Sequence, residues 1–181
     1  MSGGPEVRSR MKTMIRSGTP ADAEAIQAIY APIVRETMVS FETEVPSEQE
    51  LRRRISRSHE WLVYERAGQL IGYAYAAPFH ERAGYRWSVE VSIYLGTEAK
   101  GSGLGRELLG ALIDRLTHRG FVNAFAGIAL PNPVSVRLFE SAGFEQVAEQ
   151  RNVGFKLDGW HNVGWWQRQI NSPTDPPPEL G

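Results

Sequence analysis

The chain has 181 residues, with 20 Lys and Arg against 21 Asp and Glu, so its formal net charge is −1. This balance excludes a general affinity for nucleic acid or anionic membranes. The length suits one domain with a sizeable core. The chain has no cysteine, which excludes disulfides, thiolate nucleophiles and Cys-type zinc sites. We therefore expect a protein of the reducing cytoplasm that holds no metal.

The two ends differ in composition from the rest of the chain. Residues 1–12 lack the apolar core of a signal peptide, and we expect a disordered extension there. Residues 172–181 contain four prolines, and we expect a disordered tail. No apolar run approaches the roughly 18 residues that span a membrane. One domain is therefore expected over residues 13–171.

The first half of this domain predicts two helices and a hairpin. A short strand is expected over 14–17, and Thr19-Pro20 is typical of a helix start. A capping box at Ser47 and Glu50 begins a second helix. Its four arginines are interpreted as a solvated face rather than a nucleic-acid patch. Strands over 61–65 and 70–76 are expected to turn at Ala67-Gly68.

The second half predicts a long strand over 87–95, a glycine-rich stretch and an amphipathic helix with a buried leucine stripe. A strand over 121–128 follows. Asn132-Pro133 then opens a helix that Gly143 closes. Strands over 144–150 and 164–170 are expected to be joined by a loop rich in Gly and Trp. The order β-α-α-β-β-β-α-β-α-β-β indicates an α+β domain with a mixed sheet.

The most informative stretch is Lys100-Gly101-Ser102-Gly103-Leu104-Gly105-Arg106, between the long strand and the amphipathic helix. Glycines at alternate positions leave backbone N–H groups unobstructed. The helix start adds its own free N–H donors and the positive end of its dipole. Together these groups suit a pyrophosphate.

Three phosphate-binding patterns and a plain turn compete for this stretch. A P-loop needs a Lys-Ser/Thr pair after the glycines, which is absent. A dinucleotide fingerprint needs Gly-x-Gly-x-x-Gly with an acidic residue about 20 positions on, and neither is present. The pattern Gln/Arg-x-x-Gly-x-Gly/Ala, the pyrophosphate loop of GCN5-related N-acetyltransferases (GNAT), fits if Lys100 takes the first position. The remaining alternative is a glycine-rich turn that binds nothing.

Three blocks of sequence resemble the GNAT superfamily, and within it the phosphinothricin and methionine-sulfoximine N-acetyltransferase family. They are Tyr85-Arg86-Trp87-Ser88-Val89-Glu90-Val91 with the glycine loop, Leu130-Pro131-Asn132-Pro133 through Ala142-Gly143-Phe144, and Gly154-Phe155-Lys156 with Gly159-Trp160-His161-Asn162-Val163. The resemblance covers about residues 15–170. It implies a GNAT fold, with a central mixed, mostly antiparallel twisted sheet flanked by helices.

The resemblance also implies how acetyl-CoA binds. The strand segment Ile93, Tyr94 and Leu95 would pair its backbone with the pantetheine arm. Asn132 would hydrogen-bond the cofactor, and the helix around Phe139 and Ser141 would border its thiol end. The pyrophosphate would be cradled by the loop residues Lys100, Gly101, Ser102, Gly103, Leu104, Gly105 and Arg106.

Glu90 is the candidate general base. It lies within the strand 87–95, where a buried carboxylate is unfavourable unless it is paired or functional. Desolvation would raise its pKa toward a range useful for taking a proton, directly or through water. The resemblance places the family's catalytic glutamate here, while the residues alone also allow an edge-facing or ion-paired Glu. Backbone N–H groups near Val91 and Ser92 are expected oxyanion donors if the strand is bulged there.

The acceptor implied by the resemblance carries a carboxylate beside its amine. Arg86 and Arg82 are candidate carboxylate clamps, since a guanidinium fork matches that geometry, although each also suits a soluble surface. The resemblance places the loop Ala83, Gly84 and Tyr85 against the substrate, and Phe41 is expected to wall the pocket. One residue departs from the family: a histidine that several members carry is replaced by Phe139.

The sequence thus predicts an acetyl-CoA-dependent N-acetyltransferase that acts by direct attack on a small amino-acid-like acceptor. A polyamine, an aminoglycoside or a protein N-terminus is the alternative acceptor. A non-catalytic CoA-binding sensor is the alternative class. We also expect a homodimer.

Overall fold

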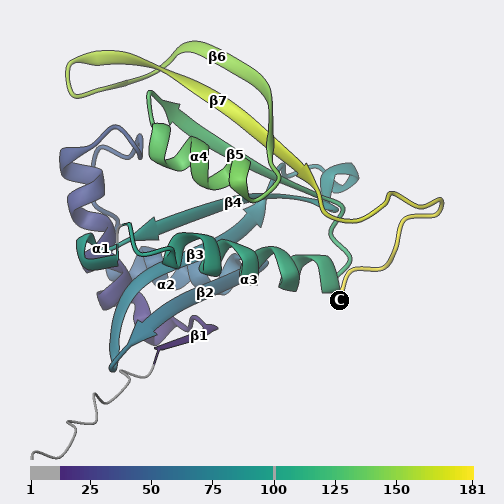
Figure 1. Ribbon diagram of the computed structural model, residues 1–181, viewed down its shortest axis with the longest axis horizontal. Coiled ribbons are helices and arrows are strands. Elements are labelled where there is room, and N and C mark those ends of the chain that lie inside the picture. The colour runs from purple at the N-terminus through teal and green to yellow at the C-terminus, as the bar shows by residue number, and fades with distance from the viewer. Residues whose placement is uncertain (1–12, 100) are drawn as a thin grey trace, which may run out of the picture.

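The computed structural model describes residues 13–99 and 101–181 of the chain (Figure 1). The extension predicted over residues 1–12 and the predicted cofactor contact Lys100 lie outside the described residues. The elements, in chain order, are β1 (Thr13–Ser17), α1 (Ala23–Glu36), α2 (Glu48–Arg57), β2 (Glu60–Arg66), β3 (Gln69–Pro78), β4 (Ser88–Leu95), α3 (Leu104–His118), β5 (Asn123–Leu130), α4 (Pro133–Ser141), β6 (Glu145–Lys156) and β7 (Gly159–Gln169). Short 3-10 turns lie at Pro20–Asp22, Ala83–Tyr85 and Thr97–Ala99.

The strands form a seven-stranded mixed sheet in the order β1-β2-β3-β4-β5-β7-β6. The pair β4–β5 is parallel, and the other neighbouring pairs are antiparallel. This arrangement confirms the predicted α+β fold with a mostly antiparallel mixed sheet and flanking helices, and the predicted element order is also confirmed.

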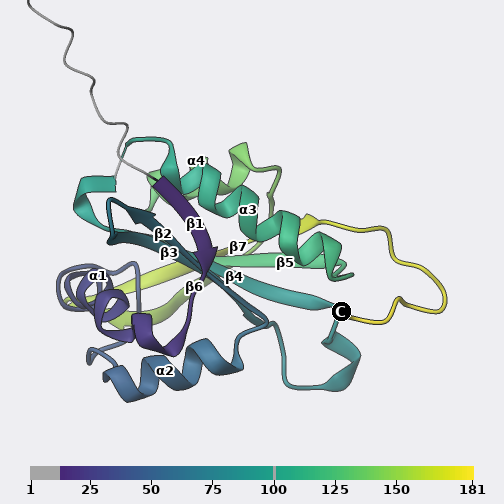
Figure 2. The same ribbon diagram turned by 90° about the horizontal axis from the view of Figure 1, so that it is seen from below.

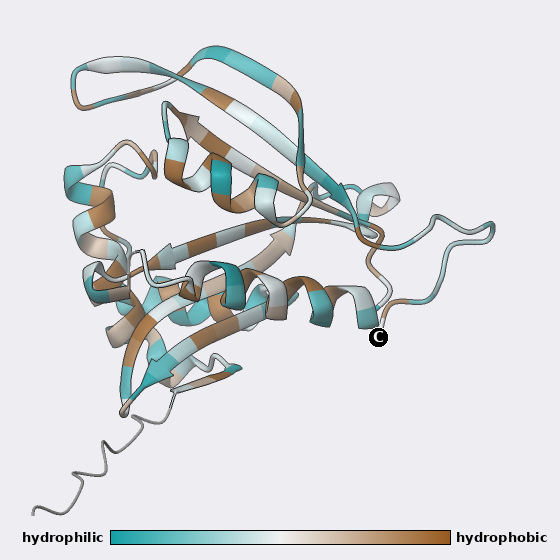
Figure 3. Cartoon of the chain, in the orientation of Figure 1, coloured by the Kyte–Doolittle hydropathy of each residue, from teal (hydrophilic) through white to brown (hydrophobic). Residues whose placement is uncertain are grey.

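Helices cover the two faces of the sheet in pairs, α1 and α2 on one face and α3 and α4 on the other (Figure 2). Leu108, Leu109 and Leu112 of α3 are fully buried, and the helix packs against β2, β3 and β4. Figure 3 shows hydrophobic and hydrophilic residues alternating along α3. On the opposite face, Ile26 and Tyr30 of α1 pack against strands β2 and β3. Each face therefore has its own apolar core.

The helix starts follow local sequence signals. Ser47 Oγ accepts a hydrogen bond from the Glu50 backbone N–H at 3.2 Å, which caps α2 as expected. Thr19 and Pro20 first open a 3-10 turn, Pro20–Asp22, and α1 itself begins at Ala23. The turn between β2 and β3 is at Ala67 and Gly68 as predicted, and both residues have positive φ.

The end of the chain differs from the prediction between residues 151 and 163. These residues were expected in a Gly- and Trp-rich loop, and that expectation is wrong: β6 and β7 run on to form a long hairpin. Leu157 and Asp158, with φ of 52° and 58°, make its two-residue turn. The register shifts between Gln146 and Ala148 and between Gln150 and Gly154. Such bulges let a strand include extra residues that interrupt the alternation of its two faces.

Residues 172–181 form no helix or strand, but their last residues contact the domain. Trp87 Nε1 donates a hydrogen bond to the Pro178 carbonyl at 2.8 Å. Arg119 Nε donates to the Gly181 carbonyl at 2.9 Å. Leu180 packs against the core on the α3 side. The proline-rich composition of this segment does not predict these contacts.

Candidate active site

The candidate site lies where the two parallel strands separate. The register of β4 with β5 runs from the pair Ser88–Asn123 to the pair Glu90–Phe125 and ends there. Beyond Glu90, β4 continues for five residues and β5 turns away from it (Figure 1). The sheet is thereby opened along one edge of β4 without losing its antiparallel partner β3. Such an opening exposes the backbone of a central strand to a ligand.

The direction of the backbone groups on β4 follows from its pairing with β3. The Phe79 N–H donates to the Ser88 carbonyl, and the Gly96 N–H donates to the Ile71 carbonyl, so even-numbered residues of β4 point their backbone groups at β3. Because successive residues in a strand alternate, Val91 points its N–H at the end of the pairing with β5, and Ile93 and Leu95 point their backbone groups into the opening. Tyr94 instead pairs with Tyr73. Two of the three residues expected to meet pantetheine thus present free backbone groups.

The register also corrects one expectation. Pairing of β3 with β4 runs without interruption from Gly72–Leu95 to Pro78–Val89, so β4 has no bulge at Val91 and Ser92. The Val91 N–H lies on the β5 side of β4, where the last step of the parallel pairing, Glu90 with Phe125, directs it at the Phe125 carbonyl. The Ser92 N–H points toward β3. The first N–H of β4 that faces the opening beyond this pairing is therefore that of Ile93.

A groove occupies the opening between the two strands. One side is formed by β4 and the other by β5 and the start of α4. The α1–α2 loop contributes Val39, which the sequence did not single out. The lining residues are Val39, Val91, Ser92, Ile93, Tyr94, Gly127, Ile128, Ala129, Asn132, Ser135 and Phe139.

The glycine loop lies at the start of α3, beyond the end of β4. Gly101 and Gly103 have φ of 73° and 83°, a conformation that glycine adopts without strain. Gly103 is the N-cap residue of α3, so the N–H groups of Leu104 and Gly105 have no partner within the helix, whereas those of Arg106 and Glu107 donate to the Gly103 carbonyl. A Cβ at Gly101 or Gly103 would meet nothing within 4 Å. These residues thus form an open, donor-rich cradle for an anion.

The other loop residues have structural roles as well. A Cβ at Gly105 would lie 3.3 Å from Leu95 Cδ1 and 3.5 Å from Leu138 Cδ2, so this glycine allows α3 to approach β4 and α4. Ser102 Oγ donates to the Ala99 carbonyl at 2.5 Å. The Leu104 side chain is buried, and Arg106 is exposed.

Glu90 lies at the point where the strands separate, on the face of the sheet opposite α3. Its side chain is partly buried, and burial raises its pKa above the ordinary value. Its neighbour in register on β3 is Ala77, and on β5 it is Phe125. A carboxylate with a raised pKa is a stronger base than an exposed one.

An aromatic surface beside Glu90 was missed from the sequence. The ring of Phe79 stacks on Phe125 with centroids 4.2 Å apart and meets Trp165 edge-on at 6.1 Å. Tyr75, opposite Ser92 in register, lies on the same face. The signal that could have found these residues is cross-strand register, which a single sequence does not reveal.

The residues expected to bind the acceptor come from two loops. Ala83, Gly84 and Tyr85 form an exposed 3-10 turn just before β4. Arg86 is also exposed, with its guanidinium 4.2 Å from the centroid of the Trp87 ring. Phe41 lies in the α1–α2 loop, and its ring is 6.1 Å from that of His161 on β7.

The residues expected on α4 divide between the groove and the surface. Asn132 lines the groove, and its Oδ1 accepts from the Ser135 N–H at 3.1 Å, so one amide atom caps α4 and the Nδ2 group is left for a ligand. Phe139 lines the groove as well and packs edge-on against Phe144 at 5.1 Å. Ser141 is exposed, and its Oγ donates to the Leu138 carbonyl.

Two other hollows lie away from the opening between β4 and β5. One of about 270 Å³ lies between α2 and β3, and one of about 490 Å³ lies between α1 and the ends of β3 and β4. Neither is lined by residues of β5 or α4, which form one side of the groove. Within residues 13–99 and 101–181, no group of His, Cys, Asp and Glu is arranged to hold a metal ion. No helix in this described part of the chain is long and apolar enough to cross a membrane.

A strand pair that opens beside a carboxylate, next to a glycine-rich helix start, defines an acyl-CoA-type transferase site. Residues 15–165 match the acetyltransferase (GNAT) domain family. The chain belongs to this family, and it is an N-acetyltransferase.

Several relatives are similar over nearly the whole chain. A phosphinothricin N-acetyltransferase of Streptomyces viridochromogenes is 37% identical, over 93% of this chain and 94% of its own length. The L-methionine sulfoximine/L-methionine sulfone acetyltransferase of Salmonella typhimurium is 33% identical, over 90% and 97%. These relatives confirm the predicted resemblance.

Solved structures agree with this assignment. The phosphinothricin acetyltransferase of Sinorhizobium meliloti in complex with AcCoA is 35% identical with a TM-score of 0.85, covering 91% of this chain and 95% of its own. A ribosomal-protein-alanine N-acetyltransferase of Brucella melitensis is also 35% identical with a TM-score of 0.81, covering 86% and 99%.

Proposed function

We propose that this enzyme transfers the acetyl group of acetyl-CoA to the amino group of a small amino-acid-like acceptor of the phosphinothricin or methionine sulfoximine type, with Glu90 as general base. The observation that carries the proposal is the position of Glu90 at the vertex of the β4–β5 opening, with a pKa raised by burial. The relatives named for these two acceptors support the substrate class.

The residues present fit acetyl-CoA. The free N–H groups from Gly101 to Gly105 would hold the pyrophosphate, and the backbone of Ile93 and Leu95 would pair with the pantetheine amides. When bound, acetyl-CoA supplies a thioester whose carbonyl carbon accepts the amine. These contacts would bring the thioester close to Glu90.

Glu90 supplies the proton transfer that the attack needs. An amino acid's amine is mostly protonated at neutral pH and has no lone pair in that form, so a base must remove a proton directly or through water. The raised pKa of Glu90 brings its basicity closer to that of the amine. Phe139 carries no proton, and a thiol ionises near pKa 8.5, so the leaving thiolate can depart as an anion.

The acceptor carboxylate would be held by Arg86. This side chain lies in the exposed turn that leads into β4, four residues before Glu90. Its guanidinium stacks on Trp87, which restricts the side chain without using its N–H donors. An exposed guanidinium with free donors is suited to a bidentate carboxylate contact. The aromatic surface of Phe79, Phe125 and Trp165 would pack against the acceptor's side chain.

A protein N-terminus is the second candidate acceptor. The Brucella melitensis relative, named for ribosomal-protein alanine, is as similar to this chain as the Sinorhizobium meliloti phosphinothricin acetyltransferase is. An extended peptide would also need a path out of the groove between the α1–α2 loop and the β6–β7 hairpin. Contact between Phe41 and His161 closes part of that path, which favours the small acceptor.

The test is a thiol-release assay with acetyl-CoA over a panel of amino acids that includes phosphinothricin, methionine sulfoximine and methionine sulfone. The matched controls are spermidine, an aminoglycoside and an alanine-starting peptide. The proposal expects the highest kcat/KM on an amino acid. Preference for the peptide or the polyamine would overturn the substrate class, and CoA binding without thiol release on any acceptor would support a sensor.

We also propose that the enzyme is a cytoplasmic homodimer. The β6–β7 hairpin exposes large apolar side chains, including Phe155 at 56% and Trp160 at 63%, whose rings meet at 5.4 Å. The cytoplasm is where acetyl-CoA is made and used. Light scattering on the full chain tests the dimer, and Trp160→Glu is expected to give monomers. A monomeric parent protein would contradict this proposal.

A further inference from the structure

Two buried polar residues outside the proposed catalytic groove contact each other, through the side chain of one and the backbone of the other. Aromatic residues aside, Ser40 at 7% and Lys156 at 8% exposure are the polar residues buried within the described part of the chain. Lys156 ends β6, and Ser40 lies in the α1–α2 loop. Lys156 Nζ donates a hydrogen bond to the Ser40 carbonyl. A pair 116 positions apart in sequence therefore links the hairpin to the loop.

Burial of Lys156 is costly to the fold. The ion pairs formed among the described residues do not include it. Removing an ammonium group from water is unfavourable unless other groups compensate for the lost hydration. Burial lowers the pKa of Lys156 below its ordinary value, and the charge of Glu42 opposes part of this effect. Lys156 is therefore held in place by the Ser40 carbonyl and by the attraction of Glu42.

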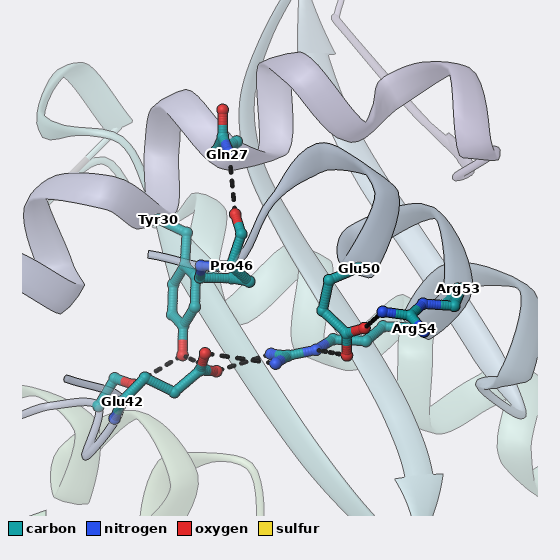
Figure 4. Close-up of polar contacts among 8 residues, drawn as sticks. Gln27, Tyr30, Glu42, Pro46, Glu50, Arg53 and Arg54 are labelled. Atoms are coloured by element: carbon teal, nitrogen blue, oxygen red, sulfur yellow. Dashed lines mark hydrogen bonds and ion pairs between the residues drawn. The ribbon is translucent and has the colours of Figure 1, made fainter. Parts of the chain in front are cut away.

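A second set of contacts holds the same loop from the helices (Figure 4). Arg54 of α2 donates to Glu42 Oε1 at 2.6 Å and to Oε2 at 3.3 Å. Tyr30 of α1 donates to Glu42 Oε1 at 3.0 Å, and its hydroxyl lies 2.6 Å from Ser40 Oγ. The two residues that flank Phe41 are thus bonded to α1, α2 and β6.

The ring of Phe41 packs directly against the backbone of β6 at Gly154. A Cβ at Gly154 would lie 2.4 Å from Phe41 Cε1, so the ring occupies the place of a side chain on β6. In the same loop, Val39 lines the groove together with Tyr94 and Phe139. The rings of Tyr94 and Tyr30 meet edge-on at 4.9 Å. The loop is therefore fixed between the groove and the hairpin.

We propose that Lys156 and Glu42 are positioning residues that hold the segment 39–41 as a rigid wall on the acceptor side of the groove. Neither touches the reacting atoms. They act through Val39 and Phe41, which limit the orientations in which the acceptor's amine reaches Glu90. This inference rests on the proposed function, since it concerns the acceptor and not acetyl-CoA.

The experiment compares Lys156→Met with Arg151→Met, a matched change at an exposed residue of the same strand. Lys156→Met keeps an unbranched side chain that is one atom shorter, and it removes the buried charge and the hydrogen bond to the Ser40 carbonyl. We expect its KM for the best acceptor to rise about tenfold, because a wall displaced by a fraction of an ångström misplaces the amine. The KM for acetyl-CoA should stay within about twofold. The melting temperature should stay level or rise, which separates positioning from a structural role.

Two further variants test the loop from its other side. Glu42→Gln, which loses the charged contact with Arg54, should raise the acceptor KM in the same direction. Arg53→Ala is its control. Arg53 lies on α2 next to Arg54, and it pairs with Glu50 rather than with Glu42 of the loop. Lys156→Arg should recover part of the acceptor affinity, since a guanidinium also donates to a carbonyl.

Hydrogen exchange gives a readout that needs no acceptor. Lys156→Met should speed exchange of the amides of residues 39–42 and leave α3 unchanged. Unchanged exchange together with unchanged KM would overturn the inference. So would a lower melting temperature with both KM values raised equally, since that result indicates a structural role. If the parent enzyme acetylates no amino acid, the proposed function fails, and faster exchange in the loop still supports the role of Lys156.

Discussion

Glu90 on β4 and Phe125 on β5 are the last residues paired in the parallel part of the sheet. The pairing of β4 with β5 ends at this pair, and the N–H groups of β4 that face the opening begin with Ile93. The proposed base and the segment proposed to pair with pantetheine therefore follow one another along a single strand. The predictions below test residues of this proposed site.

Glu90→Gln is expected to lower kcat by roughly 10²–10⁴-fold at neutral pH, the usual contribution of a positioned base. The rate of the parent enzyme should fall as Glu90 becomes protonated on the acidic side, and this dependence should flatten in the variant. At high pH, where the amine is already neutral, the two enzymes should converge. Measuring kcat/KM from about pH 6 to 10 tests this. A variant with the parental profile would show that Glu90 is not the base.

The same substitution has an opposite effect on stability. Because burial raises the pKa of Glu90, the folded state holds its proton more tightly than the unfolded state. The stabilising contribution is complete below the unfolded pKa and is lost as pH rises through the folded pKa. Glu90→Gln, which cannot ionise, should therefore raise the melting temperature more at about pH 8 than at about pH 4. An equal shift at both values would mean that the carboxylate is not penalised by burial.

Gly103→Val tests the anion cradle. Its φ of 83° strains any side chain, at about 1–2 kcal/mol, and the added methyl groups would project into the open space above the helix start. We expect acetyl-CoA to raise the melting temperature of the parent protein and to do so far less in the variant.

Gly110→Ala is the matched control for that experiment. A Cβ at Gly110, in the middle of α3, would meet nothing within 4 Å. The substitution should add about 0.5–1 kcal/mol of stability by helix propensity and leave the acetyl-CoA shift intact. If Gly103→Val keeps the full shift, the loop is only a turn.

Arg86→Ala should raise the KM for an amino acid acceptor by a factor on the order of 10 to 100, the loss of a charge-assisted pair. The KM for acetyl-CoA should barely change, because Arg86 lies on the acceptor side of Glu90. Arg82→Ala, in the same exposed turn region, is the control. A raised KM in Arg82→Ala with a parental value in Arg86→Ala would move the carboxylate contact to Arg82.

Phe139→His tests whether the histidine that several family members carry at this position would raise kcat. Phe139 is 4% exposed and packs on Phe144, so a polar ring there is expected to cost on the order of 1–3 kcal/mol. The variant should melt at a lower temperature and gain little in kcat, since the parent functions without a proton carrier at this position. A large gain in kcat would show that the natural chain is a weakened catalyst.

Local signals were sufficient for the order of elements and for the cofactor loop. Ser47 and Asn132 cap α2 and α4 because a side-chain oxygen one position before a helix satisfies a free N–H of its first turn. Gly103 takes a positive φ at the start of α3 for an equally local reason. Glu90 was identified because a carboxylate within an apolar strand is unusual wherever it occurs.

Contacts between distant segments were decided by the tertiary structure. Nothing near Glu90 in the sequence shows that β5 parts from β4 there, and the bulge on which the expected oxyanion donors depended is absent because β4 pairs with β3 without a shift of register. The hairpin of β6 and β7 replaced an expected loop because bulges let Gly and Trp residues pair. Lys156 meets Ser40 because the end of β6 lies against the α1–α2 loop. Such pairings depend on the packing of whole elements. The residues adjacent to them in sequence therefore do not reveal them.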